Sequence, residues 1–138
     1  MNDIVGARAE AMWAQDRATN GLGMRLDEVA PGRARLSMTI TETMTNGHGI
    51  CHGGFIFALA DSAMAFAVNP RGEPAVAQHA QITFIRPAHV GETLVANCEE
   101  RMHAGRSGMY DVRVTTAAGD LIAEFRGHTR TIPAKAET

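Results

Sequence analysis

The chain has 138 residues, of which 45% are hydrophobic and 20% charged, so it is long enough to bury one core but short for two domains. Its formal net charge is -2, without a basic block for nucleic acid or an acidic tail, and two cysteines are too few for a disulfide scaffold. There is no signal-peptide pattern and no apolar run of about 18 residues. We therefore expect one domain over residues 1–138, cytoplasmic, that binds neither nucleic acid nor a membrane.

The N-terminal part predicts a helix followed by a β-hairpin. Residues 3–19 carry small and apolar side chains on one side, and an Asn-Gly pair ends the segment. Residues 33–40 alternate strictly between apolar and polar side chains, which is typical of a half-buried strand. A Pro-Gly turn precedes that strand, so residues 22–29 are expected to be its hairpin partner.

After a loop over residues 41–52, residues 54–68 form an apolar helix that contains one carboxylate, Asp61. The segment has no consistently polar face, so we expect a helix buried on all sides. Aspartate is rarely buried unless something compensates its charge. Asp61 is therefore either used in chemistry or held structurally by Ser62, a loop amide or an arginine.

The remainder of the chain predicts only strands, over residues 75–86, 92–102, 107–117 and 121–132. Sequential strands joined by short turns favour an antiparallel sheet. A helix that is apolar all round needs cover, which one curled sheet and a partner chain could supply. The predicted class is α+β, with an antiparallel sheet wrapped around a long central helix.

A glycine pair, Gly53 and Gly54, stands where this helix begins. Without side chains, the backbone can be approached closely by a ligand. The first N–H groups of a helix have no intrahelical acceptor and lie at the positive end of its dipole. They suit a carbonyl oxygen that becomes an oxyanion. The alternative is that the glycines only let the loop turn tightly into the helix.

The spacing of Gly53 and Asp61 bears on oligomeric state. The two are eight residues apart, which at ~1.5 Å per residue is about 12 Å along the axis. A nucleophile or base must stand about 3 Å from the reacting atom. One chain struggles to bring both groups to one centre, whereas two antiparallel helices across a two-fold axis can do so. We therefore predict an obligate dimer with shared active sites.

Other polar residues lie just before the glycine pair. A metal site at His48, Cys51 and His52 is disfavoured because no second pair of ligands has zinc spacing. A Cys51–His52 nucleophilic pair lacks a third group to orient the histidine. His52 is expected to fix the loop or to hydrogen-bond a substrate carbonyl. Asn46 is either a donor and acceptor at the site or an ordinary turn residue.

Several arginines could contact phosphate groups, because guanidinium suits bidentate phosphate recognition. They are Arg86 at the end of a strand, Arg106 between two strands and Arg126, near His128, on the last strand. The alternative for each is a solvated surface charge. Tyr110 is expected mainly to pack in the core.

The motifs resemble those of a known family. They are Asn46-Gly47-His48, Cys51-His52-Gly53-Gly54 and Leu59-Ala60-Asp61-Ser62-Ala63, with Ile82-Thr83-Phe84-Ile85-Arg86-Pro87, Gly91-Glu92-Thr93-Leu94 and Gly108-Met109-Tyr110-Asp111. Together they resemble the hotdog-fold acyl-CoA thioesterases of the PaaI type, which are associated with phenylacetate degradation. The resemblance covers roughly residues 10–132.

This resemblance implies a hotdog fold paired into dimers and often into dimer-of-dimers tetramers. It also implies hydrolysis of acyl-CoA without a metal or other cofactor, coenzyme A being part of the substrate. By residue match, Asp61 is the nucleophile or general base and comes from the facing subunit, while the Gly53 N–H polarises the thioester carbonyl. Asn46 and His52 surround the reacting centre. The expected substrate contacts are Gly54, Ser62, Phe84, Arg86, Pro87, Arg106 and Tyr110.

The leading hypothesis is thus a thioesterase for aryl-acyl-CoA, such as phenylacetyl-CoA or hydroxyphenylacetyl-CoA. A hotdog-fold enoyl-CoA hydratase or dehydratase is a second hypothesis, in which His52 and a partner's Asp61 act as a histidine–carboxylate pair. A non-catalytic acyl-CoA binding protein is the third.

Overall fold

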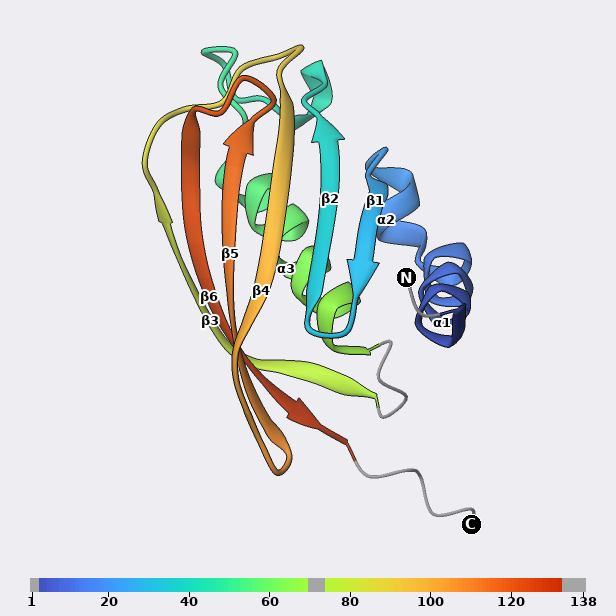
Figure 1. Ribbon diagram of the computed structural model, residues 1–138. Coiled ribbons are helices and arrows are strands. Elements are labelled where there is room, and N and C mark those ends of the chain that lie inside the picture. Colours follow the sequence, from blue (N-terminus) through green and yellow to red (C-terminus); the bar gives the residue numbers. More distant parts are fainter. Residues whose placement is uncertain (1–2, 70–73, 133–138) are drawn as a thin grey trace.

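A computed structural model describes residues 3–69 and 74–132 of the chain (Figure 1). The helices are α1 (Asp3–Gln15), α2 (Arg17–Gly21), the 3-10 turn η1 (Glu42–Met44) and α3 (Gly53–Val68). The strands are β1 (Arg25–Ala30), β2 (Arg33–Thr39), β3 (Ala75–Phe84), β4 (Thr93–Ala104), β5 (Ser107–Thr116) and β6 (Leu121–Thr131).

The predicted helix over residues 3–19 is in fact two helices. The helix is interrupted at Asp16, which has an extended backbone. The Asp16 side chain caps α2 by accepting a 2.9 Å hydrogen bond from the amide of Thr19. Aspartate is a strong N-cap residue, so a second helix begins here and the first one ends. Trp13 of α1 packs on Phe66 of α3, with ring centroids 5.8 Å apart.

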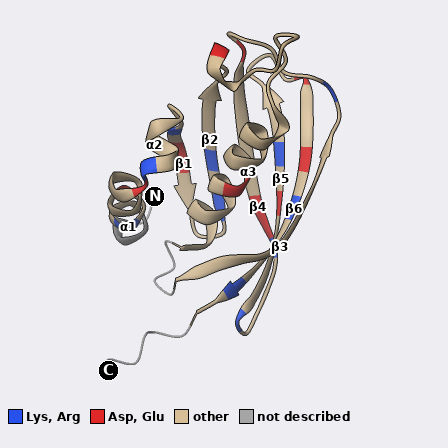
Figure 2. Cartoon of the chain, turned by 180° about the vertical axis from the view of Figure 1, so that it is seen from behind, with Lys and Arg blue, Asp and Glu red and all other residues tan. Residues whose placement is uncertain are grey.

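The strands form one antiparallel sheet in the order β1-β2-β4-β5-β6-β3. The expected pairing of sequential strands holds for β4, β5 and β6. It does not hold for β3, which crosses to the far edge and pairs with β6. The predicted antiparallel sheet around a central helix is confirmed, because α3 lies across the concave face (Figures 1 and 2).

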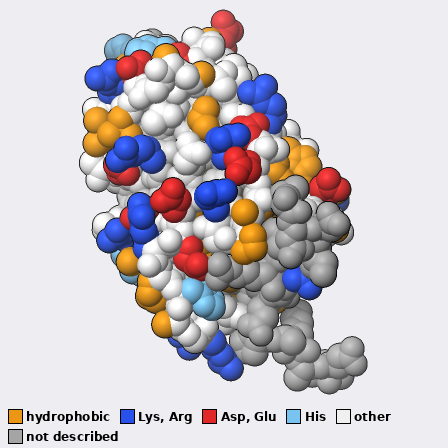
Figure 3. Space-filling model, in the orientation of Figure 1, with side chains coloured by type: hydrophobic (Ala, Val, Ile, Leu, Met, Phe, Trp, Pro, Cys, Tyr) orange, Lys and Arg blue, Asp and Glu red, His pale blue; other side chains and the backbone are white. Residues whose placement is uncertain are grey.

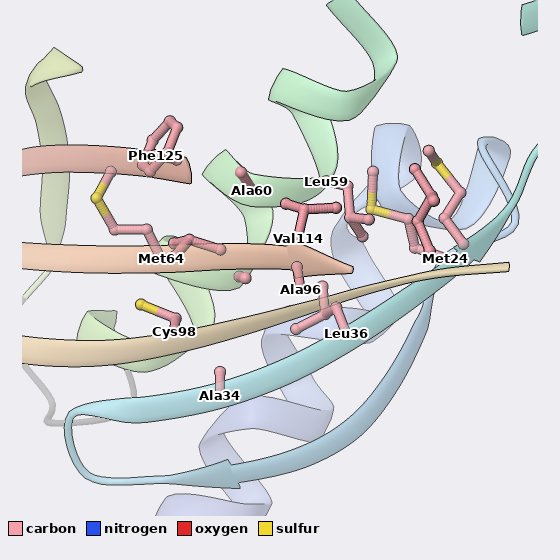
Figure 4. Close-up of a cluster of buried hydrophobic side chains, with 14 of the residues drawn as sticks. Met24, Ala34, Leu36, Leu59, Ala60, Met64, Ala96, Cys98, Val114 and Phe125 are labelled. Atoms are coloured by element: carbon pink, nitrogen blue, oxygen red, sulfur yellow. The ribbon is translucent and has the colours of Figure 1, made fainter. Parts of the chain in front are cut away.

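The core lies between the concave face of the sheet and α3 (Figure 4). Inward positions alternate along the strands, as expected of a sheet with one buried face. Side chains from five elements, α3, β2, β4, β5 and β6, meet there with almost no exposed surface. They include Ala34, Leu36, Leu59, Ala60, Met64, Ala96, Cys98, Val114 and Phe125.

One face of α3 is left uncovered by the sheet, which is the part of its surroundings that a partner chain was expected to supply. Leu59, Ala63 and Phe66 are fully buried. The opposite side of the helix is intermediate or exposed, at Gly54, Ala58, Asp61 and Ala65. A curled sheet can cover only part of a helical cylinder. These four positions, spaced i, i+4, i+7 and i+11, are called the open face of α3 below.

Strand β3 is an edge strand that exposes large apolar side chains to solvent. Val76 is 48% exposed and Phe84 is 49% exposed, and Ile85, directly after the strand, is 50% exposed. The outer side of β3 has no neighbouring strand in the sheet. Unpaired edges of this kind are natural places for a second chain to add.

Candidate active site

The start of α3 is held in place by the loop before it. The amide of Cys51 donates to the carbonyl of Ala88 and the amide of His52 donates to the carbonyl of Met44, both at 2.8 Å. His52 occupies the N-cap position, and its exposed imidazole makes no capping hydrogen bond. Tethered on two sides, the loop fixes the direction in which α3 begins and leaves the His52 ring free for other contacts.

Gly53 and Gly54 present free amides at this helix end. No described residue accepts a hydrogen bond from either N–H. A side chain at Gly53 would place its Cβ 2.6 Å from Cζ of Phe84, so any larger residue there would have to displace the Phe84 ring. Gly54 is exposed and has open space beside it. The two amides can thus donate to an anionic oxygen approaching from the Gly54 side.

Asn46 stabilises the loop through its side-chain oxygen, while its side-chain nitrogen stays available as a donor. Its Oδ1 accepts from the amide of His48 at 2.8 Å and from the amide of Ile50 at 3.2 Å. Its Nδ2 donates to no described residue. The side chain is therefore an ordinary turn contact through its oxygen, while its nitrogen can donate to a ligand.

Asp61 lies in the middle of the open face of α3. Its carboxylate forms no hydrogen bond and no ion pair with any residue in the described part of the chain. Burial raises the pKa of the Asp61 carboxyl above its ordinary value, because desolvation disfavours the charged form. Ser62 beside it is half-buried. None of the structural partners considered for Asp61 is in place within the described residues.

A cavity of about 400 Å³ adjoins the start of α3. It brings together four of the predicted site residues, Gly53, Phe84, Arg86 and Pro87. Its walls are otherwise mostly apolar, with Ile50, Cys51, Ile56, Ile85 and Ala88. The Arg86 guanidinium is exposed and lies 3.5 Å from the Asp120 carboxylate. No local pattern marks the isoleucines as site residues, although Ile85 stands between Phe84 and Arg86 in the chain.

Two predicted substrate contacts lie elsewhere in the protomer. Tyr110 is fully buried in the core, where its hydroxyl donates to Glu100 at 3.1 Å, so it offers no surface to a ligand. Arg106 is in the exposed β4–β5 turn, at the opposite end of the sheet from the start of α3 (Figure 1).

Arg126, considered as a phosphate contact, instead holds Asp111. Arg126 contacts both Asp111 oxygens, at 2.6 and 2.8 Å. Hydrogen bonds from Arg126 and Arg101 lower the pKa of the Asp111 carboxyl. Both side chains alternate with buried neighbours along β5 and β6 and so lie on the outer face of the sheet. Figure 3 shows acidic and basic side chains alternating over this face.

Two other hollows are away from this site. One of about 550 Å³ lies between α1 and β1, and one of about 560 Å³ is lined by polar side chains of β4, β5 and β6. Neither is lined by a predicted site residue. Within residues 3–69 and 74–132, no group of three His, Cys, Asp or Glu side chains could hold a metal ion.

No helix in the described part of the chain combines the length and the apolar character needed to cross a membrane.

Comparisons with known proteins agree with this geometry. Residues 48–123 match the thioesterase superfamily. The chain is 39% identical over 124 residues to acyl-coenzyme A thioesterase PaaI of Escherichia coli, covering 90% of this chain and 89% of that protein. It is 35% identical over 137 residues to human acyl-coenzyme A thioesterase 13, covering 94% and 97%.

The solved structure of the E. coli PaaI protein from the phenylacetic acid degradation operon superposes with a TM-score of 0.93 and 36% identity, covering 96% of each chain. The TT0310 protein of Thermus thermophilus gives a TM-score of 0.82 at 36% identity, covering 86% of this chain and 99% of that one. These matches confirm the predicted hotdog fold and PaaI-type resemblance. The chain belongs to the thioesterase superfamily.

Proposed function

We propose that the protein hydrolyses acyl-CoA thioesters at sites shared between two protomers, with aryl-acyl-CoA such as phenylacetyl-CoA or hydroxyphenylacetyl-CoA as substrate. One observation carries the proposal. The carboxylate of Asp61 and the free amides of Gly53 and Gly54 lie on one helix, yet about 12 Å apart along it. The aryl substrate is supported by the E. coli relative, because that protein comes from the phenylacetic acid degradation operon.

A two-fold dimer can bring Asp61 of one protomer close to the Gly53 amide of the other. If two α3 helices lie antiparallel with their open faces in contact, Asp61 of one protomer comes beside Gly53 of the other when the axis passes near residues 57 and 58. Ala58 is small enough to allow a close approach there. The exposed edge of β3 can pair with its own copy in the same assembly, which would bury Val76 and extend the sheet.

The chemistry follows from this placement. The ionised Asp61 attacks the thioester carbonyl or removes a proton from an attacking water, and the carbonyl oxygen becomes negatively charged. Amides at the start of α3, with Asn46 Nδ2, donate hydrogen bonds to that oxygen. The C–S bond then breaks and coenzyme A leaves as the thiol. When water attacks, the free acid forms directly, and the proton that Asp61 took from the water passes to the sulfur. When Asp61 attacks, the acyl group stays on its carboxylate as an anhydride until a water molecule hydrolyses it to the free acid and supplies the proton for the sulfur. A desolvated carboxyl with a raised pKa is suited to act as a base.

Several finer expectations stay predictions. They are the dimer-of-dimers tetramer, the cytoplasmic location, a single domain over residues 1–138 and chemistry without a metal or cofactor. Arg86 lines the cavity and is exposed, which supports it among the described arginines as the contact for a coenzyme A phosphate. Arg106 can take part only if it is supplied by another protomer.

The test is thiol release from a panel of aryl and aliphatic CoA esters. Wild-type protein should release thiol, and Asp61→Asn should lower kcat by about 100- to 10,000-fold. Asp27→Asn makes the same chemical change at an exposed position on β1 and serves as the control. Near-normal hydrolysis by Asp61→Asn would overturn the role given to this carboxylate.

The same assay distinguishes the two alternative functions, a hydratase and a non-catalytic binding protein. Exposed His52, together with a partner's Asp61, could carry out hydration, so the panel includes an enoyl-CoA. Loss of its conjugated double bond without thiol release would favour a hydratase. Tight binding of every ester with neither reaction would favour a non-catalytic binding protein.

A further inference from the structure

Phe84 is placed unusually for an aromatic residue on a sheet edge. It ends β3 and is 49% exposed, yet its ring lies against the first residue of α3. The three heavy atoms nearest to a Cβ built on Gly53 all belong to this ring, at 2.6, 3.1 and 3.1 Å. One side of the Gly53 backbone is therefore covered by an aromatic ring, while the Gly54 side is open.

The strand holds Phe84 in this position. It pairs with Ala123 of β6, whose small side chain leaves room, and the next amide, that of Ile85, donates to the carbonyl of Ile122 at 2.7 Å. Phe84 also lines the 400 Å³ cavity together with Ile56. The ring thus touches both the oxyanion-binding end of the helix and the apolar space beside it.

We infer that Phe84 determines acyl specificity, and this inference rests on the proposed thioesterase activity. A flat ring beside the Gly53 amide offers an aryl acyl group an aromatic partner, which attracts it beyond what area burial provides. A saturated acyl group of the same size gains the burial but not the ring–ring contact.

The experiment compares two substrates that differ only in aromaticity, phenylacetyl-CoA and cyclohexylacetyl-CoA. For Phe84→Leu, kcat/KM should fall on the order of tenfold further for the phenyl ester than for the cyclohexyl ester. Phe84→Tyr should keep the wild-type ratio, since the ring is retained. Val90→Ala, a change at a 44% exposed apolar residue that does not line the cavity, should also keep it.

A double-mutant cycle tests the contact itself. Gly53→Ala should lower both thermal stability and hydrolysis because its Cβ meets the Phe84 ring. Phe84→Leu should relieve part of the loss in stability, so that the effects of the two changes do not add. Additive effects would show that the ring does not cover Gly53.

The outcomes separate the inference from the proposed function. If the wild type hydrolyses both esters and Phe84→Leu leaves their ratio unchanged, only the specificity role is overturned. If the wild type hydrolyses neither ester but releases thiol from others in the panel, the aryl substrate is wrong and the specificity role falls with it. If it hydrolyses no ester of the panel, the thioesterase proposal itself fails, whatever the coupling in stability.

Discussion

Asp61 combines two properties that rarely occur together, partial burial and the lack of a partner among the described residues. Because burial raises its pKa, the folded chain binds a proton more readily than the unfolded chain between the two pKa values. Stability contributed by this group is therefore present at low pH and is lost as pH rises through that window. At neutral pH the ionised carboxylate is a cost to the fold.

Asp61→Asn should consequently leave the protein at least as stable as the wild type while it removes hydrolysis. The amide cannot ionise, so the cost of the buried charge disappears. Thermal midpoints at pH 7 and near pH 4 measure the effect, and the advantage of the variant should shrink at the lower pH. Asp27→Asn should show no such pH-dependent gain, and a marked loss of stability in Asp61→Asn would mean that the carboxylate has a structural partner.

The pH dependence of hydrolysis should also reflect the raised pKa of Asp61. The reaction requires ionised Asp61, so kcat/KM should fall as pH decreases through the pKa of this group. Because desolvation raises that pKa, the acid limb should lie above the value of about 3.9 of a free aspartate. A pH profile of kcat/KM over the acid range decides this, and a limb at the free-aspartate value would place Asp61 in water during the reaction.

At the residue scale the sequence indicated Asp61 and Gly53 because each stands out in an apolar segment. It could not indicate that Phe84 covers Gly53. That contact arises because β3 crosses to the far edge of the sheet and ends over the start of α3, which no local pattern reveals. Tyr110 shows the converse, since its place in a recognisable motif suggested substrate contact and the structure buries it.

At the scale of elements, a single protomer leaves part of the surface of α3 and the outer edge of β3 open. The open face of α3 consists of small residues around one carboxylate, and β3 presents an unpaired edge. A change in the middle of the open face should therefore separate the protomers without harming the fold.

Ala58→Arg is that change. The long cationic side chain would stand where two helices must approach closely, so sedimentation should show monomers, and hydrolysis should be lost although each chain keeps Asp61 and Gly53. Ala11→Arg introduces the same residue on an exposed part of α1 and should change neither property. A fully active dimer of Ala58→Arg would mean that the shared site is assembled through another surface.

The element boundaries were largely predictable, because periodicity is a local property. The strand over residues 33–40 and the helix over 54–68 match β2 and α3 within one residue at each end. The break at Asp16 was missed because the apolar stripe continues through a capping residue. Strand order was missed at β3 because it depends on how the sheet closes around α3.

At the scale of the whole molecule, the two sides of the sheet differ in how many of their charged side chains form ion pairs within the chain. On the outer face, Arg33 pairs with Glu28 and Arg113 with Glu124, while Asp111 is held by two arginines (Figure 3). Because Asp111 has a lowered pKa, its contribution to stability is present above its unfolded pKa and is lost as pH falls through the folded one. Ion pairs link many charges within the chain on this face, whereas the open face of α3 carries Asp61, a carboxylate without a partner among the described residues.

Subunit mixing tests whether association of two protomers completes the site. A Gly53→Val chain lacks a usable oxyanion end and an Asp61→Asn chain lacks the base, so each homodimer should be inactive. If every site joins Gly53 of one protomer to Asp61 of the other, a mixed dimer contains one site with both changes and one site with neither. Random pairing at equal amounts should then restore about a quarter of wild-type activity. If each site lay within one chain, every site in the mixture would carry one defect, and the mixture would stay as inactive as its parts.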